Sequence, residues 1–225
     1  MGRAFEPYAL TTMPMLLTSC SDSTKDVQVA GREAAQTVVS QITSTGLRLM
    51  VKPLLEGLQD KRWRTQLSAV ELLQPIIASM VADSPKRLAA VLPKVVPLLC
   101  NTVSSTRNEV RDSSREVLEQ IGSAITHTDI KALAPQIIAA LVDPADGPML
   151  KALDTLLSAV FTTTIDTASC SLICPIVARA LARGDSEAKK KGASFVRTIV
   201  QLIGEQEELI PYLSSLWPQL QSLLA

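Results

Sequence analysis

The chain has 225 residues, of which 47% are hydrophobic and only 3% aromatic, so it can bury a sizeable core. Leu, Ala, Val and Ile dominate the apolar residues, a mixture that favours helix–helix packing over β-sandwich cores. Lys and Arg total 22 against 22 Asp and Glu, which excludes a global field that would attract nucleic acid or membrane. Any such binding must be local.

The N-terminal segment has an acid, Glu6, and a proline, Pro7, where a signal peptide needs a continuous apolar core. No run approaches the roughly 18 apolar residues of a membrane span, and Leu88 to Cys100 is broken by Pro93, Lys94 and Pro97. The cysteines lack the paired spacing of a zinc or secreted disulfide framework; they are Cys20, Cys100, Cys170 and Cys174. We therefore expect a soluble chain in the reducing cytosol.

A proline recurs along the chain in a similar apolar context, as in Pro-Leu-Leu and Pro-Gln-Ile-Ile. The recurring residues are Pro14, Pro53, Pro97, Pro135, Pro175 and Pro218, separated by 39, 44, 38, 40 and 43 residues. A period of about 40 to 47 residues made of two helices is typical of HEAT and armadillo repeats. Each proline is predicted to lie in, and bend, the first helix of a hairpin.

A polar break follows each predicted first helix, with short side chains that cap helices well. These residues are Asp22, Asp60, Ser104 with Ser105, Asp143 and Asp185. The second helices are predicted to start near Lys25, Lys61, Asn108, Gly147 and Ser186. Each is expected to carry an apolar residue followed by a polar, usually cationic one; the pairs are Val27-Gln28, Trp63-Arg64, Val110-Arg111, Leu150-Lys151 and Ala188-Lys189.

The predicted fold class is therefore an all-α solenoid of about five and a half HEAT hairpins, forming one array over residues 1–225. The predicted units are 6–43, 44–83, 84–127, 128–165, 166–206 and a half unit, 207–225. The last helix, predicted over Leu209 to Leu224, keeps an apolar face with no partner helix after it. We interpret the chain as a piece of a longer array, unless another element covers both ends.

Four segments resemble a known family: Gly-Arg-Ala-Phe-Glu-Pro-Tyr (2–8), Lys-Arg-Trp-Arg-Thr-Gln-Leu-Ser-Ala-Val-Glu-Leu-Leu (61–73), Ser-Pro-Lys-Arg-Leu-Ala-Ala-Val-Leu-Pro-Lys-Val-Val-Pro-Leu-Leu (84–99) and Leu-Ile-Pro-Tyr-Leu (209–213). They are similar to the elongation-factor-three-like HEAT region of the ribosome-binding translational activator of general amino-acid control. The resemblance covers essentially the whole chain, and the tryptophan segment is its most specific part.

This resemblance implies binding to translating or stalled ribosomes and to an ATP-binding-cassette translation protein. It also implies a place in signalling amino-acid starvation or ribosome stalling to an initiation-factor kinase. The kinase-docking part of that family has no counterpart in these residues, so the link to the kinase is indirect. The Gly-x-x-x-x-Gly-Lys-Ser/Thr phosphate loop of the nucleotide-binding cassettes is also absent from the sequence.

Cationic residues on the second helices are the candidate binding residues for ribosomal RNA backbone. Arg64, Arg111, Lys151 and Lys189 are expected at corresponding positions of their repeats. Lys190 and Lys191, which follow Lys189, are further candidates. The alternative is a solvated face whose cations pair with Glu71, Asp112, Glu116 and Asp154. Trp63, flanked by Arg62 and Arg64, is a further candidate as a contact for a partner protein, or else it packs between adjacent hairpins.

No catalytic site is predicted. His127 is the single histidine and falls in a loop between repeats, while Cys170 and Cys174, one turn apart, have no further ligand near them in sequence. We expect no enzyme, metal, cofactor, small-molecule substrate or membrane partner. The leading hypothesis is a cytoplasmic scaffold that binds ribosomes and translation-associated proteins; the alternative is a structural spacer, or generic protein-binding solenoid, without direct ribosome contact.

Overall fold

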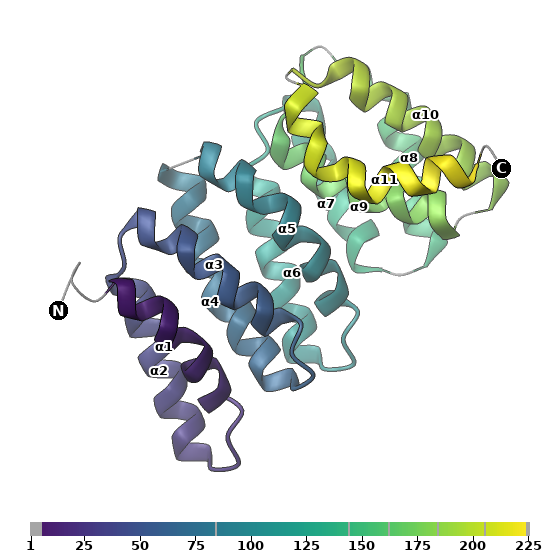
Figure 1. Cartoon of the computed structure of the whole chain (residues 1–225). Coiled ribbons are helices and arrows are strands. Elements are labelled where there is room, and N and C mark those ends of the chain that lie inside the picture. The colour runs from purple at the N-terminus through teal and green to yellow at the C-terminus, as the bar shows by residue number, and fades with distance from the viewer. Residues whose placement is uncertain are drawn as a thin grey trace. The chain divides into compact units, whose positions relative to one another are not determined.

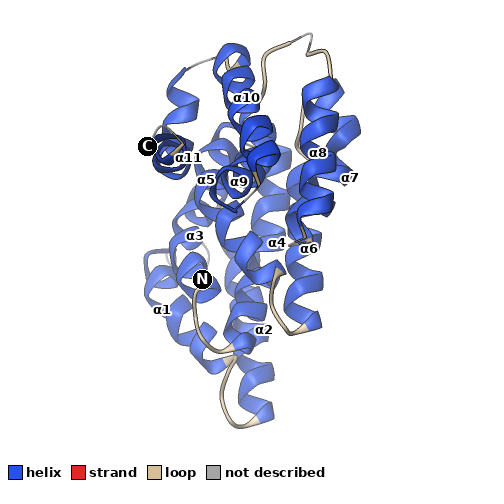
Figure 2. Cartoon of the chain, turned by 90° about the vertical axis from the view of Figure 1, so that its right-hand side faces the viewer, coloured by secondary structure: helices blue, strands red, loops and turns tan. Residues whose placement is uncertain are grey.

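The computed structural model describes residues 6–83, 85–143, 145–161, 163–183, 185–204 and 206–223. These residues form α-helices joined by short loops (Figure 2), together with one 3-10 helix, Gln206–Leu209, and an isolated β-bridge between Ile165 and Ile203. The chain divides into two compact units, Met1–Gln120 and Ile121–Ala225. Residues 2–5 of the first resembling segment and Leu224 lie outside the described ranges.

The first unit is built from helical hairpins (Figure 1). Its helices are α1 (Glu6–Ser19), α2 (Lys25–Gln41), α3 (Ser44–Leu58), α4 (Trp63–Asp83), α5 (Pro85–Val103) and most of α6 (Asn108–Ser123). The first helices of the hairpins, α1, α3 and α5, contact one another in chain order, and the second helices α2 and α4 form another layer. The side chains between the layers are almost wholly buried, as at Met13, Leu54 and Leu73.

The second unit repeats this arrangement with α7 (Thr128–Val142), α8 (Asp146–Ser158), α9 (Thr167–Arg183), α10 (Ser186–Leu202) and α11 (Ile210–Ser222). Here α7, α9 and α11 form one layer, and α8 and α10 form the other. Helix α9 is at the centre, because α7, α8, α10 and α11 all contact it. Its run from Ala168 to Cys174 is buried throughout, which fits a sequence of small and apolar residues without a charge.

The recurring prolines lie inside first helices, as predicted, in α1, α3, α5, α7, α9 and α11. The second helices begin at Lys25, Trp63, Asn108, Asp146 and Ser186, within two residues of the predicted starts. One proline was not anticipated as part of this scheme. Pro75 lies inside a second helix, α4, where it has no N–H to donate to the Glu71 carbonyl four residues earlier.

The polar breaks close the hairpin turns, although mostly not as helix caps. Three aspartates accept a hydrogen bond from the backbone N–H two residues later: Thr24 N donates to Asp22 at 2.8 Å, Arg62 N to Asp60 at 2.8 Å and Ala145 N to Asp143 at 2.9 Å. This is the Asx-turn. Only Asp185 caps its helix through the side chain, by accepting from Ala188 N at 2.8 Å. In the α5–α6 turn, Ser105 rather than Ser104 holds the backbone, accepting from Arg107 N at 3.3 Å.

Carboxylates also join consecutive hairpins at the junctions between repeats. Glu6 at the start of α1 accepts from Thr43 N at 2.7 Å, and Glu208 before α11 accepts from Thr167 Oγ1 at 3.0 Å. Asp166 before α9 accepts from Thr126 N, Thr126 Oγ1 and His127 N at 2.8 to 2.9 Å. These three junctions therefore depend on an acid of one hairpin and polar donors of its neighbour.

Helix α4 is the one described helix that is long and apolar enough to cross a membrane, over Trp63–Ala82 with a mean hydropathy of 1.2. No such segment was predicted from the sequence, where no uninterrupted apolar run approaches that length. In the structure 56% of that segment is buried, and α4 contacts α2, α3 and α5. These features are those of a core helix of the first unit.

Candidate interaction surfaces

Trp63 is the first residue of α4 and is half-buried. The guanidinium carbon of Arg64 lies 4.6 Å from its ring centroid, and that of Arg107, from the α5–α6 turn, lies 5.1 Å away. Both distances allow a cation–π interaction. The ring therefore packs against the next hairpin, as one of the two interpretations of Trp63 expected, and its contact with a partner remains a prediction.

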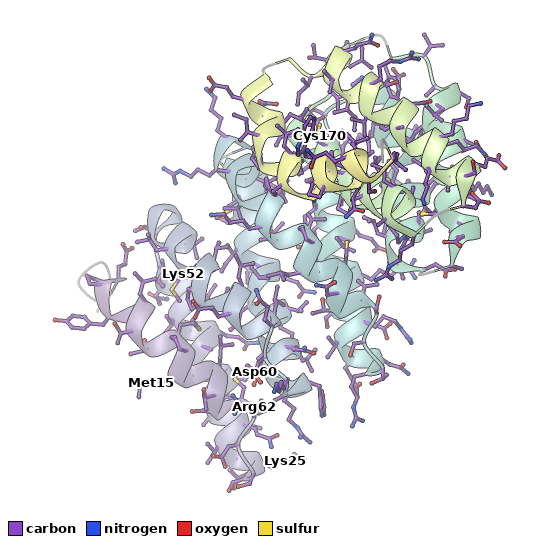
Figure 3. The ribbon with its side chains drawn as sticks, turned by 45° about the vertical axis from the view of Figure 1, so that its right-hand side comes forward. Met15, Lys25, Lys52, Asp60, Arg62 and Cys170 are labelled. Carbon is purple, nitrogen blue, oxygen red and sulfur yellow. The ribbon has the colours of Figure 1, made fainter. Side chains whose placement is uncertain are left out.

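Arg62 is held by its own turn. Its Nε and Nη2 donate to the two carboxylate oxygens of Asp60 at 3.1 and 2.9 Å, and both residues are labelled in Figure 3. These hydrogen bonds keep the pKa of the Asp60 carboxyl below its ordinary value. Because the guanidinium is already bonded to an acid on two sides, Arg62 is a weak candidate for a phosphate contact.

Counted from the start of each helix, the predicted cations do not share one position. Arg111 and Lys189 are the fourth residues of α6 and α10, but Arg64 is the second residue of α4 and Lys151 the sixth of α8. For Arg64 the difference arises because α4 begins two residues later than predicted, and for Lys151 the earlier start of α8 adds one residue. The fourth residue of α4 is Gln66, whose amide donates to Asp60 O at 2.8 Å.

Several cations pair with acids, as the alternative interpretation expected. Arg111 donates to Asn108 Oδ1 at 2.8 Å and lies 3.9 Å from Asp112 Oδ1. Lys191 Nζ lies 2.7 Å from Asp154 Oδ1 and 2.6 Å from Glu187 Oε1. Glu116 instead accepts from Gln74 at 2.7 Å, and Glu71 pairs with Arg32 at 3.3 Å. The three consecutive lysines of α10 are therefore not equivalent.

A smaller set of cations faces solvent in the second unit. Lys190 and Arg197 are exposed and seven residues apart, so they share one side of α10. Lys151 is exposed on the neighbouring helix α8, one turn before Asp154. Within the part of the chain that the structure describes, no acid forms an ion pair with these three side chains. We call these three exposed side chains of the contacting helices α8 and α10, Lys151, Lys190 and Arg197, the open cation cluster; Lys189 precedes Lys190 in the chain and is half-buried.

The first unit contains a hollow of about 580 Å³ between α2 and α4, which the sequence did not indicate. Glu71 lines it, and its side chain is only 25% exposed. Burial raises the pKa of Glu71, while Arg32 opposes the shift. An acid on a second helix gave no sequence signal of this environment, since its burial depends on α2, a whole repeat away.

His127 is a structural residue. It is buried at the start of α7, where Nδ1 accepts from Ile130 N at 3.4 Å and Nε2 donates to Thr163 O at 3.2 Å. Its ring also meets that of Phe161 edge-on at 5.7 Å. Both polar atoms of the imidazole are thus used inside the fold, and neither faces solvent as a general base would need.

Cys170 and Cys174 are buried free thiols in α9, and Cys170 is labelled in Figure 3. Burial raises the pKa of Cys170 to about 12 and that of Cys174 well above its ordinary value. Their thiolates are therefore scarce at neutral pH, although nucleophiles and metal ligands require that form. Among the described residues, no group of three or more His, Cys, Asp or Glu could hold a metal ion.

Stacked helical hairpins with polar turns, acid-linked junctions and surface cations define a HEAT-type α-solenoid, a class of binding scaffold. Two family models match the chain: "EF3 N-terminal HEAT repeat" over residues 1–118 and "Elongation factor 3/GNC1 HEAT repeat" over residues 148–225. The chain belongs to this elongation factor 3/GNC1 HEAT-repeat family. The resemblance found in the sequence and the predicted fold class are both confirmed.

Longer proteins contain a similar region. Protein ILITYHIA of Arabidopsis thaliana is 36% identical over 100% of this chain, and the human stalled ribosome sensor GCN1 is 35% identical over 100% of it. Elongation factor 3 of Candida albicans is 24% identical over 100% of the chain. The chain spans 8% of the length of each of the first two proteins and 21% of the third.

Proposed function

We propose that this chain is a non-catalytic, cytoplasmic HEAT-repeat scaffold that binds ribosomes and translation-associated proteins as part of a translational activator. Family membership supports the association with translation. Its relatives carry the names stalled ribosome sensor GCN1, eIF-2-alpha kinase activator GCN1 and elongation factor 3. In this proposal the chain takes part in signalling amino-acid starvation or ribosome stalling to an initiation-factor kinase. Its link to that kinase is indirect.

The observation that carries ribosome contact is the open cation cluster. A phosphate backbone is bound chiefly by Lys and Arg side chains, and each contact releases condensed counterions. Lys151, Lys190 and Arg197 have no acid partner among the described residues, so binding a phosphate would not require an existing ion pair to break. Lys189 at the edge of the cluster adds to the local positive charge. An ATP-binding-cassette protein would bind elsewhere on the same scaffold.

Co-sedimentation of the chain with ribosomes at several salt concentrations tests this proposal. Replacing Lys151, Lys190 and Arg197 together by Ser is expected to weaken binding and to flatten the slope of log affinity against log salt by roughly 0.7 to 0.9 per lost phosphate contact. The matched control replaces Arg62, Arg111 and Arg115 by Ser, which removes the same charge from side chains already bonded to neighbours. This control is expected to bind nearly as wild type.

A structural spacer is the second candidate function, favoured by the internal pairing of Arg62, Arg111 and Lys191. It predicts no co-sedimentation even at low salt, a result that would overturn ribosome contact by this chain. Equal weakening by the two triple variants would instead show that net charge alone drives association, and would remove the open cation cluster as the binding site.

A further inference from the structure

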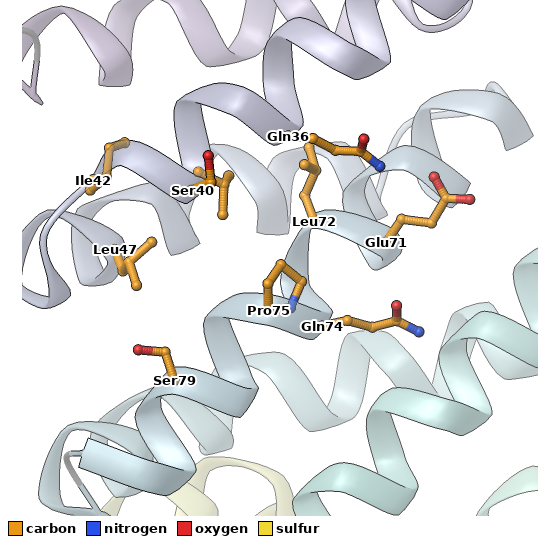
Figure 4. A pocket seen from close by; sticks show the side chains of 10 residues that line it. Gln36, Ser40, Ile42, Leu47, Glu71, Leu72, Gln74, Pro75 and Ser79 are labelled. Carbon is orange, nitrogen blue, oxygen red and sulfur yellow. The ribbon is translucent and has the colours of Figure 1, made fainter. Parts of the chain in front are cut away.

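The hollow between α2 and α4 has two chemically different ends (Figure 4). Ile42 and Leu47 lie at one end together with Ser40 and Ser79, and Glu71 and Gln74 form the other, polar end. Leu72 and Pro75 lie between the two ends and give the hollow an apolar middle. A guest whose apolar stem packs on Leu72 and Pro75 and whose polar head reaches Glu71 and Gln74 would match this order of groups.

The polar end is rich in hydrogen-bond acceptors. Glu71 Oε2 is buried beside Arg32 Nε at 3.3 Å and accepts no hydrogen bond, while the Glu71 side chain as a whole is 25% exposed, so a guest would reach its carboxylate through Oε1. The amide nitrogen of Gln74 donates to Glu116 Oε2 at 2.7 Å, which leaves its carbonyl oxygen as an acceptor. A guest head group must therefore donate hydrogen bonds.

A cationic head group fits the electrostatics of this end. Arg32 balances one carboxylate, that of Glu71, at 3.3 Å, and Glu116 adds a second carboxylate bonded to Gln74, so one negative charge at this end has no cation beside it among the described residues. Lys and Arg side chains carry several N–H donors on the head and an apolar stem that packs along hydrophobic surface. A phosphate group would meet both carboxylates.

We propose that the α2–α4 hollow binds an arginine or lysine side chain presented by a basic segment of a partner protein. The stem lies along Leu72 and Pro75 towards Ile42 and Leu47, and the head donates to the Glu71 carboxylate. This site is in the first unit and selects a cation, whereas the open cation cluster is in the second unit and selects an anion. A result that contradicts one proposal therefore does not contradict the other.

Methyl NMR of the whole chain tests the site with a defined probe. Titration with the blocked tripeptide acetyl-Gly-Arg-Gly-amide is expected to shift the methyl signals of Val39, Leu47 and Leu72 along a saturating curve. The same peptide with citrulline, an uncharged isostere of arginine, is expected to bind about tenfold more weakly, because hydrogen bonds between charged groups are the stronger ones. Equal shifts by the two peptides would overturn the proposal, as would no saturable shift with either.

Substitution of the acid gives the second test. Glu71→Gln keeps the size of the side chain and is expected to weaken binding of the arginine peptide about tenfold. The matched control, Glu56→Gln, removes the same charge from an exposed site on α3 and should leave the affinity within twofold. Equal loss in both variants contradicts a specific site. An RNA oligonucleotide that shifts the same three methyl signals would show that the hollow takes nucleic acid instead.

Glu71→Gln is not expected to unfold the chain. Burial raises the pKa of Glu71, so the ionised carboxylate is less stable in the folded chain than in water, and a neutral amide removes that cost. The variant should unfold at a urea concentration at least as high as wild type. A lower midpoint would indicate that its ion pair with Arg32 outweighs burial, and the citrulline comparison would then decide the proposal on wild-type protein.

Discussion

Trp63 shows how a residue with a specific sequence context can have a structural environment that the sequence does not reveal. Its neighbour Arg64 was evident, but Arg107 comes from the next hairpin, 44 positions later in the chain. One signal existed: Arg62 and Arg107 both lie two residues after the acceptor of a turn, Asp60 and Ser105. Aligning the turns rather than the prolines would have placed Arg107 beside the start of α6.

Replacing Arg107 by Ala is expected to cost about 0.5–1 kcal/mol of the free energy of unfolding, the usual value of a partly exposed cation–π contact. The same substitution in a Trp63→Leu background should cost clearly less, because the ring is gone. Urea unfolding of the four proteins measures this coupling. Arg115→Ala, which removes an exposed ion pair with Glu119, is the control and should show no coupling to Trp63. Equal costs in both backgrounds would exclude the interaction.

At the scale of elements, the sequence predicted the helices well and the register of their side chains less well. Proline spacing located every first helix, since its apolar pattern repeats with it. The start of α4 was predicted two residues early, because Lys61 and Arg62 resemble a helix start but belong to an Asx-turn. Two residues rotate a helical side chain by roughly 200°, so Arg64 does not share the position of Arg111 and Lys189 counted from the helix start.

The junction between α8 and α9 carries a testable pH dependence. Burial would raise the pKa of Asp166, but the hydrogen bonds from Ser169, Thr126 and His127 outweigh it and lower the pKa. Asp166→Asn places an NH₂ group against these donors and is expected to cost about 1–3 kcal/mol of unfolding free energy at pH 7. A depressed folded pKa stabilises the chain above the unfolded value of about 3.9, and this contribution is lost as pH falls through the folded pKa.

The difference between wild type and Asp166→Asn should therefore shrink in urea titrations below about pH 4. Asp112→Asn is the control, since Asp112 is exposed and has one ion pair at 3.9 Å; its effect should be small at every pH. A difference for Asp166→Asn that stays constant down to pH 2 would mean that its carboxylate is not the group responsible.

At the scale of the whole molecule, the limit between the two compact units falls inside a helix. Residues up to Gln120 belong to the first unit and those from Ile121 to the second, yet α6 runs from Asn108 to Ser123. In a solenoid, each repeat is stabilised by its contacts with its neighbours. A continuous helix should therefore couple the unfolding of the two units. Composition and repeat spacing gave no sign of this limit, because the period is the same on both sides.

Each unit contains one tryptophan, Trp63 in the first and Trp217 in the second, which allows the coupling to be measured. Single-tryptophan variants, Trp63→Phe and Trp217→Phe, are expected to unfold in urea with coincident midpoints. Glu119→Pro breaks α6 at an exposed position, costs about 3 kcal/mol, and should separate the two midpoints. Glu119→Ala is the control and should keep them together. Separate midpoints without the proline would contradict coupling through α6.

The acid-linked junctions restrict how such an array changes length during evolution. Their partners lie 37, 39 and 41 residues apart, at Glu6–Thr43, Asp166–His127 and Glu208–Thr167. A residue inserted at a junction moves the carboxylate away from its donors, whereas one inserted in a hairpin turn leaves both partners fixed to their own helices. Insertions and deletions among related chains should therefore collect in the turns, and the junctions should keep a constant length.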